Sequence, residues 1–142
     1  MKITRLSVVG LCFLLAGTAA KGQVDAKSTS DGVYTAPQAE TGSKVYAQYC
    51  ASCHGADLAG GEMAPGLVSG DFQSNWNTLT LDQLFDRIRN TMPQDRPQTL
   101  SSAEAASVLA YVLAKTGFPA GKSALPATRD ELMLITYSTS KP

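Results

Sequence analysis

The sequence has 142 residues, enough for one domain of ordinary size and too few for two comfortable ones. Its hydrophobic fraction of 44% and charged fraction of 17% exclude a coiled coil and a wholly disordered chain. Twelve basic residues balance twelve acidic ones, so no basic excess indicates a nucleic-acid partner. Three cysteines and a single histidine remain as the residues most suited to chemistry.

Residues 1–22 have the order of a secretory signal peptide. Lys2 and Arg5 precede an apolar run over residues 6–16, and small residues follow it. Because this run is shorter than the roughly 20 residues of a membrane span, we expect cleavage near residues 20–22 and a periplasmic protein. Membrane contact is expected only if the leader is retained. Cleavage after Gly22 leaves nine basic against twelve acidic residues, a net charge of −3, and removes Cys12.

The remaining chain predicts an all-α domain with three main helices and long loops. Residues 23–40 are small, polar and aperiodic and predict a flexible lead-in, with order beginning near Thr41. A helical stripe from residue 43 runs into Cys50 and Cys53, and the glycine-rich residues 55–78 predict a long loop. A loop of that length in a small domain usually wraps something.

Capping patterns mark the later helices. Thr80 with Gln83 predicts a helix that Pro93 ends, and Ser101 with Glu104 predicts a second one that closes near residue 117. Residues 41–121 then form the main domain, and residues 122–142 form a C-terminal extension with one short helix after Thr128. Such a chain has few internal apolar residues, so a large apolar cofactor would fill its core.

The segment Cys50-Ala51-Ser52-Cys53-His54 carries the strongest functional signal. Positions i, i+3 and i+4 share one face of a helix, so both thiols and the imidazole point the same way. This is the arrangement for attachment of haem c, in which the two sulfurs bond to the macrocycle and the histidine reaches its iron. We therefore predict one covalently attached haem, held by Cys50 and Cys53, with His54 as an iron ligand.

Two other sites could use the same cysteines. A thiol–disulfide centre also has two cysteines at this spacing, but it usually lies at a helix start after a strand, and no such strand pattern is present. A structural zinc site needs four ligands, whereas Cys50, Cys53 and His54 supply three. The thiol alternative predicts a colourless exported protein.

The single histidine restricts the second axial ligand of the iron, since no other imidazole is available in this chain. Met63 follows His54 too closely for its loop to pass easily round the haem, and Met133 lies at core spacing in the C-terminal extension. Met92 follows a complete helix and precedes Pro93, so we predict Met92 as the axial ligand, giving His/Met ligation.

With these motifs the chain, over roughly residues 41–121, resembles a small single-haem cytochrome c of the His/Met type (class I). The resemblance implies the cytochrome c fold and a close crossing of the first and last helices at Gly42 and Tyr46, with Tyr111 as the facing aromatic. It also implies that the Pro65 carbonyl accepts a hydrogen bond from His54, a contact that orients the ring. Trp76 is similar to an aromatic that binds a haem propionate, although it is equally plausible as core filler.

The resemblance implies an electron carrier and not an enzyme. Residues 116–126 are similar to the tail of exported cytochromes that accompany quinone-cofactor dehydrogenases, so the expected donor is a periplasmic dehydrogenase and the acceptor an oxidase or another cytochrome. The alternative is a haem protein with an open sixth position, acting as a peroxidase-like enzyme or gas binder. The two functions differ at Met92 alone.

Overall fold

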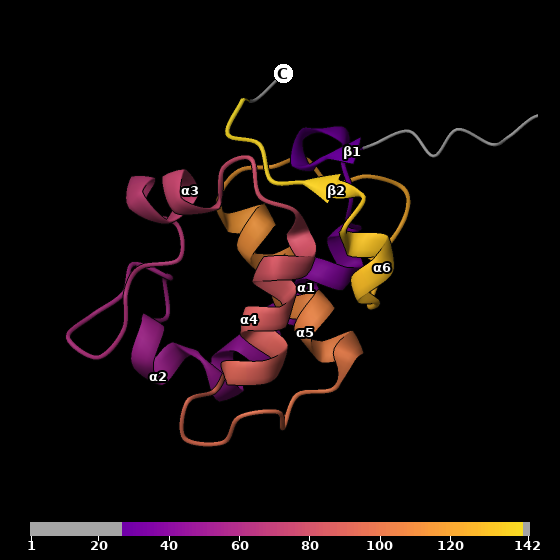
Figure 1. Ribbon diagram of the computed structural model, residues 1–142. Helices are drawn as coiled ribbons and strands as arrows, with labels where there is room; N and C mark the ends of the chain where they lie inside the picture. Colours follow the sequence, from indigo (N-terminus) through magenta and orange to yellow (C-terminus); the bar gives the residue numbers. More distant parts are fainter. Residues whose placement is uncertain (1–26, 141–142) are drawn as a thin grey trace, which may run out of the picture.

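The computed structural model describes residues 27–140, so the predicted signal peptide lies outside the described residues. The three main helices expected from the sequence are α1 (Ala36–Tyr49), α4 (Leu81–Thr91) and α5 (Ser102–Lys115). The shorter elements are β1 (Lys27–Ser28), η1 (Thr29–Asp31), α2 (Ala51–His54), α3 (Gly70–Trp76), α6 (Arg129–Leu132) and β2 (Ile135–Thr136). The mostly helical architecture confirms the predicted fold class (Figure 1).

Helices α1 and α5 cross at very short range, as the resemblance implied. A Cβ atom added at Gly42 would lie 1.8 Å from the carbonyl oxygen of Ser107, so only glycine fits this position of α1. One turn later, the Tyr46 and Tyr111 rings pack with centroids 5.4 Å apart and planes inclined by 55°. This crossing fixes the end of α1, which leads directly into Cys50.

Helix α4 begins and ends where the sequence predicted. Met92 follows its last residue with φ −120° and ψ 149°, the extended geometry expected before Pro93. The capping box expected at Thr80 and Gln83 is not formed. The Thr80 hydroxyl makes no hydrogen bond to the helix backbone; it donates to the Asp82 carboxylate and accepts from the Gln83 side-chain amide at 3.4 Å.

Helix α5 opens with the predicted capping box. The Ser101 hydroxyl accepts from the Glu104 N–H at 3.2 Å, and the Glu104 carboxylate accepts from the Ser101 N–H at 2.8 Å. The Ser101 hydroxyl also donates to the Glu104 carboxylate at 2.6 Å, and this bond, together with the one from the Ser101 N–H, lowers the pKa of Glu104. The helix is the most buried element of the domain, and its residues 105–110 are all buried.

The predicted long loop over residues 55–78 contains a helix that the sequence analysis missed. Helix α3 is capped by Ser69, whose hydroxyl accepts from the Phe72 N–H at 3.2 Å. Phe72 and Trp76, four residues apart, pack against each other with ring centroids 6.1 Å apart and against the core. The glycine content of this segment concealed a helix only seven residues long.

The prediction of a flexible lead-in over residues 23–40 is wrong for residues 27–40. Strand β1 pairs in parallel with β2, and Thr29 is fully buried, exchanging hydrogen bonds with the backbone of Ser138. Val33 and Tyr34 are buried in the main core. Because small polar residues dominate this segment, its sequence pattern did not show these two apolar anchors.

The C-terminal extension packs onto the same core as the helices, through Leu125, Leu132, Ile135 and Tyr137. Its short helix, α6, confirms the one predicted after Thr128. We call residues 27–35 and 118–140 together the terminal clasp. In Figure 1 β1 and β2 of the clasp lie at the upper right and α6 lies at the right, whereas α2 lies at the lower left.

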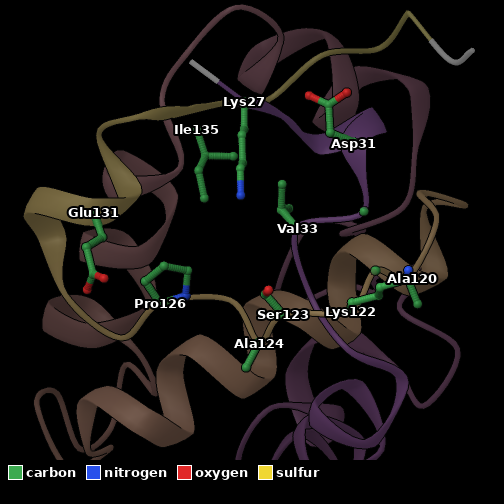
Figure 2. A pocket seen from close by; sticks show the side chains of 12 residues that line it. Lys27, Asp31, Val33, Ala120, Lys122, Ser123, Ala124, Pro126, Glu131 and Ile135 are labelled. Carbon is green, nitrogen blue, oxygen red and sulfur yellow. The ribbon is translucent and has the colours of Figure 1, made fainter. Parts of the chain in front are cut away.

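An open cavity of about 760 Å³ lies within the terminal clasp and is lined by Lys27, Val33, Lys122, Glu131 and Ile135, among others. Figure 2 shows the Lys27 side chain pointing into it beside Ile135. None of its lining residues is a cysteine, a histidine or a methionine. Within residues 27–140, no helix combines the length and the hydropathy that crossing a bilayer requires.

Arg129 fastens the terminal clasp to α4. Its guanidinium contacts the buried Asp82 carboxylate at 3.3 Å and the Asp86 carboxylate at 3.1 Å. We expect Arg129→Gln to lower the free energy of unfolding by about 1–2 kcal/mol, because Asp82 would stay buried without its charged partner. Urea denaturation checks this value. Lys44→Gln, which removes an exposed ion pair, is the control. If Arg129→Gln lowers the free energy of unfolding by no more than Lys44→Gln does, the prediction is contradicted.

Candidate functional site

A second and larger cavity, of about 1310 Å³, lies between α2, α3, α4 and α5. Cys50, Cys53, His54 and Met92 all line it, as does Trp76. Its volume exceeds the usual 300–1,000 Å³ of small-molecule sites, so it can hold a large planar cofactor. The structure thus brings all four predicted site residues to one cavity.

Backbone hydrogen bonds set the arrangement of the two thiols and the imidazole. Cys50 is the C-cap residue of α1, and its carbonyl accepts from the N–H groups of Cys53 at 3.1 Å and His54 at 3.0 Å. This single turn, α2, keeps the three side chains at helical spacing beside the cavity.

The pKa of Cys50 also bears on the thiol alternative. Burial, with a smaller contribution from Cys53, raises the pKa of Cys50 to about 11. Reactive thiols of disulfide oxidoreductases have lowered pKa values instead. The environment of Cys50 therefore disfavours the thiolate that a disulfide oxidoreductase needs.

The imidazole of His54 is oriented by the loop that follows it. Its Nδ1 atom lies 2.8 Å from the carbonyl oxygen of Pro65. Since a carbonyl oxygen can only accept, Nδ1 carries the proton in the neutral ring and leaves the Nε2 lone pair available to a metal. The hydrogen bond implied by the resemblance is therefore present.

Two glycines place the Pro65 carbonyl. Gly60 has φ +85°, and a Cβ atom there would lie 2.4 Å from the Gly66 nitrogen. A Cβ atom at Gly66 would lie 2.6 Å from the Ala59 carbonyl oxygen. The backbone of residues 58–67 can fold back under His54 only because both positions lack a side chain.

Tyr46 connects this loop to the helix crossing. The side chain is 1% exposed, and its hydroxyl donates to the carbonyl oxygen of Gly55 at 2.7 Å. Burial raises the pKa of Tyr46, so the hydroxyl keeps its proton for this bond. The sequence indicated the aromatic ring at this position but gave no sign of the hydroxyl's partner.

The three methionines within residues 27–140 differ in their relation to the cavity. Met92 is partly buried and lines it. Met63 also lines it but is 77% exposed, and Met133 is 51% exposed and is not a lining residue. A thioether ligand to iron must turn inward, so the exposure of the side chains favours Met92.

Other lining residues supply apolar walls and a few charges. Val108 and Val112 of α5 and Phe72 of α3 form part of the wall. The predicted loop over residues 55–78 did not single out Phe72. The signal for a capped helix was Ser69 followed by Phe72 and Trp76. Trp76 both lines the cavity and packs on the core, so the two roles considered for it are compatible with its position.

The donor set fits haem c. Two thiols and an imidazole with a free Nε2 lie on one element, and a thioether lies on another element beside the same largely apolar cavity. This combination of sulfur and nitrogen ligands is that of His/Met haem proteins.

Comparisons with known proteins agree with this chemistry. The model of the family described as "Cytochrome C oxidase, cbb3-type, subunit III" matches residues 37–112, which include Cys50, Cys53, His54 and Met92. A search of curated proteins finds no significant match.

One solved structure is similar over most of the chain, a chain of the sulfane dehydrogenase SoxCD from Paracoccus pantotrophus. The TM-score is 0.53 and the sequence identity 22%, over 76% of this chain and 62% of that one. This chain thus spans less than two thirds of the length of its structural relative. At this identity the likeness concerns the fold.

Proposed function

Because the chain belongs to the cytochrome c family described as cbb3-type cytochrome c oxidase subunit III, we propose that it is a periplasmic carrier of single electrons with one haem. Membership of this family implies covalently bound haem c and electron transfer. The observation that carries the proposal is the meeting of Cys50, Cys53, His54 and Met92 at one cavity.

The residues of the chain have distinct roles in this function. Cys50 and Cys53 would hold the cofactor covalently, the Pro65 carbonyl orients the His54 ring so that its Nε2 could bind the iron, and Met92 would supply a second ligand. Val108 and Val112 exclude water from the cavity. The bound iron supplies a change of one electron between its ferrous and ferric states. Methionine ligation and burial favour the ferrous state and raise the reduction potential.

We further propose a dehydrogenase as electron donor and an oxidase or another cytochrome as acceptor. A dehydrogenase is the protein named for the similar solved structure, and an oxidase subunit is named in the family description. Export to the periplasm rests on the signal-peptide pattern of residues 1–22. The net charge of −3 after cleavage favours a partner with a basic face.

Absorption spectra of the exported protein test the proposed function. After acid–organic extraction of loose haem, we expect sharp bands in the reduced protein and the weak far-red band of methionine ligation in the ferric protein. Attached haem without the far-red band, with ready binding of cyanide, would support the open-site haem protein instead. A colourless protein would support the thiol alternative.

A further inference from the structure

The loop that carries Met92 is anchored at its two ends and exposed between them. Pro93 and Leu100 are buried, whereas residues 94–99 are exposed. Within this stretch the Arg96 N–H donates to the Pro93 carbonyl at 3.0 Å, and the Thr99 hydroxyl donates to the Arg96 carbonyl at 2.9 Å. These bonds shape the loop but do not attach it to the opposite wall of the cavity.

One side-chain contact joins the Met92 loop to α1. The guanidinium carbon of Arg96 lies 5.7 Å from the centroid of the Tyr49 ring, within the range of a cation–π interaction. Asp95 contacts the Arg96 Nε at 3.1 Å and thereby orients the guanidinium. Both Tyr49 and Arg96 line the cavity.

The position of Tyr49 gives this contact its significance. It is the last residue of α1 and immediately precedes Cys50, so it belongs to the wall that carries the cysteines and His54. Among the hydrogen bonds, ion pairs and ring contacts of residues 27–140, the contact between Arg96 and Tyr49 alone joins residues 92–100 to α1 or α2. The other side-chain tie, from Arg89 to the Gln98 carbonyl at 3.3 Å, leads back to α4 itself.

We propose that Arg96 and Tyr49 are positioning residues that hold the Met92 loop closed and keep external ligands from the iron. The inference rests on the proposed function, in which Met92 is the axial ligand. An external ligand can bind only when Met92 has moved away, so its apparent affinity is proportional to the fraction of open molecules. A contact that stabilises the closed loop lowers this fraction.

The ferric protein is titrated with imidazole, and loss of the far-red band is used to detect binding. The apparent affinity then reports changes in the fraction of open molecules. Because Arg96 is 57% exposed, its contact has the strength of an exposed cation–π pair, equivalent to about two- to five-fold in an equilibrium constant. We expect Arg96→Gln and Tyr49→Leu each to tighten imidazole binding by about two- to five-fold. Tyr49→Phe keeps the aromatic face and should bind imidazole as the unchanged protein does.

Two controls separate this effect from loss of charge and of stability. Lys122→Gln removes a positive charge in the terminal clasp, and Arg129→Gln weakens the clasp; neither side chain touches the Met92 loop. Both should leave imidazole affinity unchanged. The double variant Arg96→Gln/Tyr49→Leu should bind imidazole no more tightly than the tighter single variant, since each substitution already removes the same contact.

Two results would overturn the inference: unchanged imidazole affinity in Arg96→Gln, or a fold-change in the double variant equal to the product of the two single fold-changes. If the unchanged protein shows the far-red band, Met92 ligation stands in either case. If the unchanged protein lacks that band, the methionine ligation in the proposed function is refuted and this inference with it. The two failures are therefore distinguishable in a single set of titrations.

Discussion

Met92→Ala is expected to leave the haem covalently attached while abolishing the far-red methionine band and opening the sixth position of the iron. Cys50, Cys53 and His54 belong to another segment and do not depend on Met92 for their arrangement. The reduction potential should fall by on the order of tenths of a volt, because axial ligands set haem potentials over roughly 0.8 V. Absorption spectra, redox titration and cyanide binding check these three effects.

Met63→Ala is the matched control for this prediction. Met63 lines the same cavity but is 77% exposed, so its loss should change neither the band nor cyanide binding. A far-red band that persists in Met92→Ala and disappears in Met63→Ala would reverse the ligand assignment. Such a result would require residues 61–66 to turn inward, against the hydrogen bond from the Gly61 N–H to the Ala64 carbonyl at 2.9 Å.

The covalent half of the site was predictable from the sequence because its geometry is local. Cys50, Cys53 and His54 lie within a single turn, and helical spacing alone places them together. Met92 could be chosen by elimination, since only four methionines are present and Pro93 forces the residue before it out of helical geometry. The contact of Arg96 with Tyr49 depends on the tertiary path of the loop, which no sequence period encodes.

The termini were less predictable, because their order comes from distant partners. Residues 27–40 contain few apolar side chains, and local composition indicates flexibility for such a segment. The order arises from contacts with residues about a hundred positions away, such as the bonds between Thr29 and Ser138. Capping patterns gave the helix starts correctly, but the Thr80 hydroxyl pairs with the side chains of Asp82 and Gln83 and makes no hydrogen bond to the helix backbone.

Gly42→Ala is expected to be the most destabilising single methyl addition in the helical core. Alanine improves the intrinsic propensity of a helix position by roughly 1 kcal/mol relative to glycine. The added Cβ would, however, lie 1.8 Å from a backbone carbonyl oxygen of α5, so the two helices must separate. Overpacking of a core costs typically about 1–3 kcal/mol. Because a backbone atom cannot rotate away as a side chain can, we expect a net loss of about 2 kcal/mol or more in the free energy of unfolding.

Gly70→Ala provides the comparison that isolates this steric effect. Gly70 is also helical, at the start of α3, and no atom lies within 4 Å of the Cβ that alanine would add. Its substitution should therefore be neutral or slightly stabilising in the same urea denaturation experiment. Separation of α1 from α5 in the Gly42 variant would also disturb the packing of Tyr46 on Tyr111. The hydrogen bond from the Tyr46 hydroxyl to the Gly55 carbonyl, next to His54, would be disturbed with it. Equal stability of the two variants would show that α1 and α5 can accommodate a methyl group at Gly42. The crossing could then not be what fixes the position of α2.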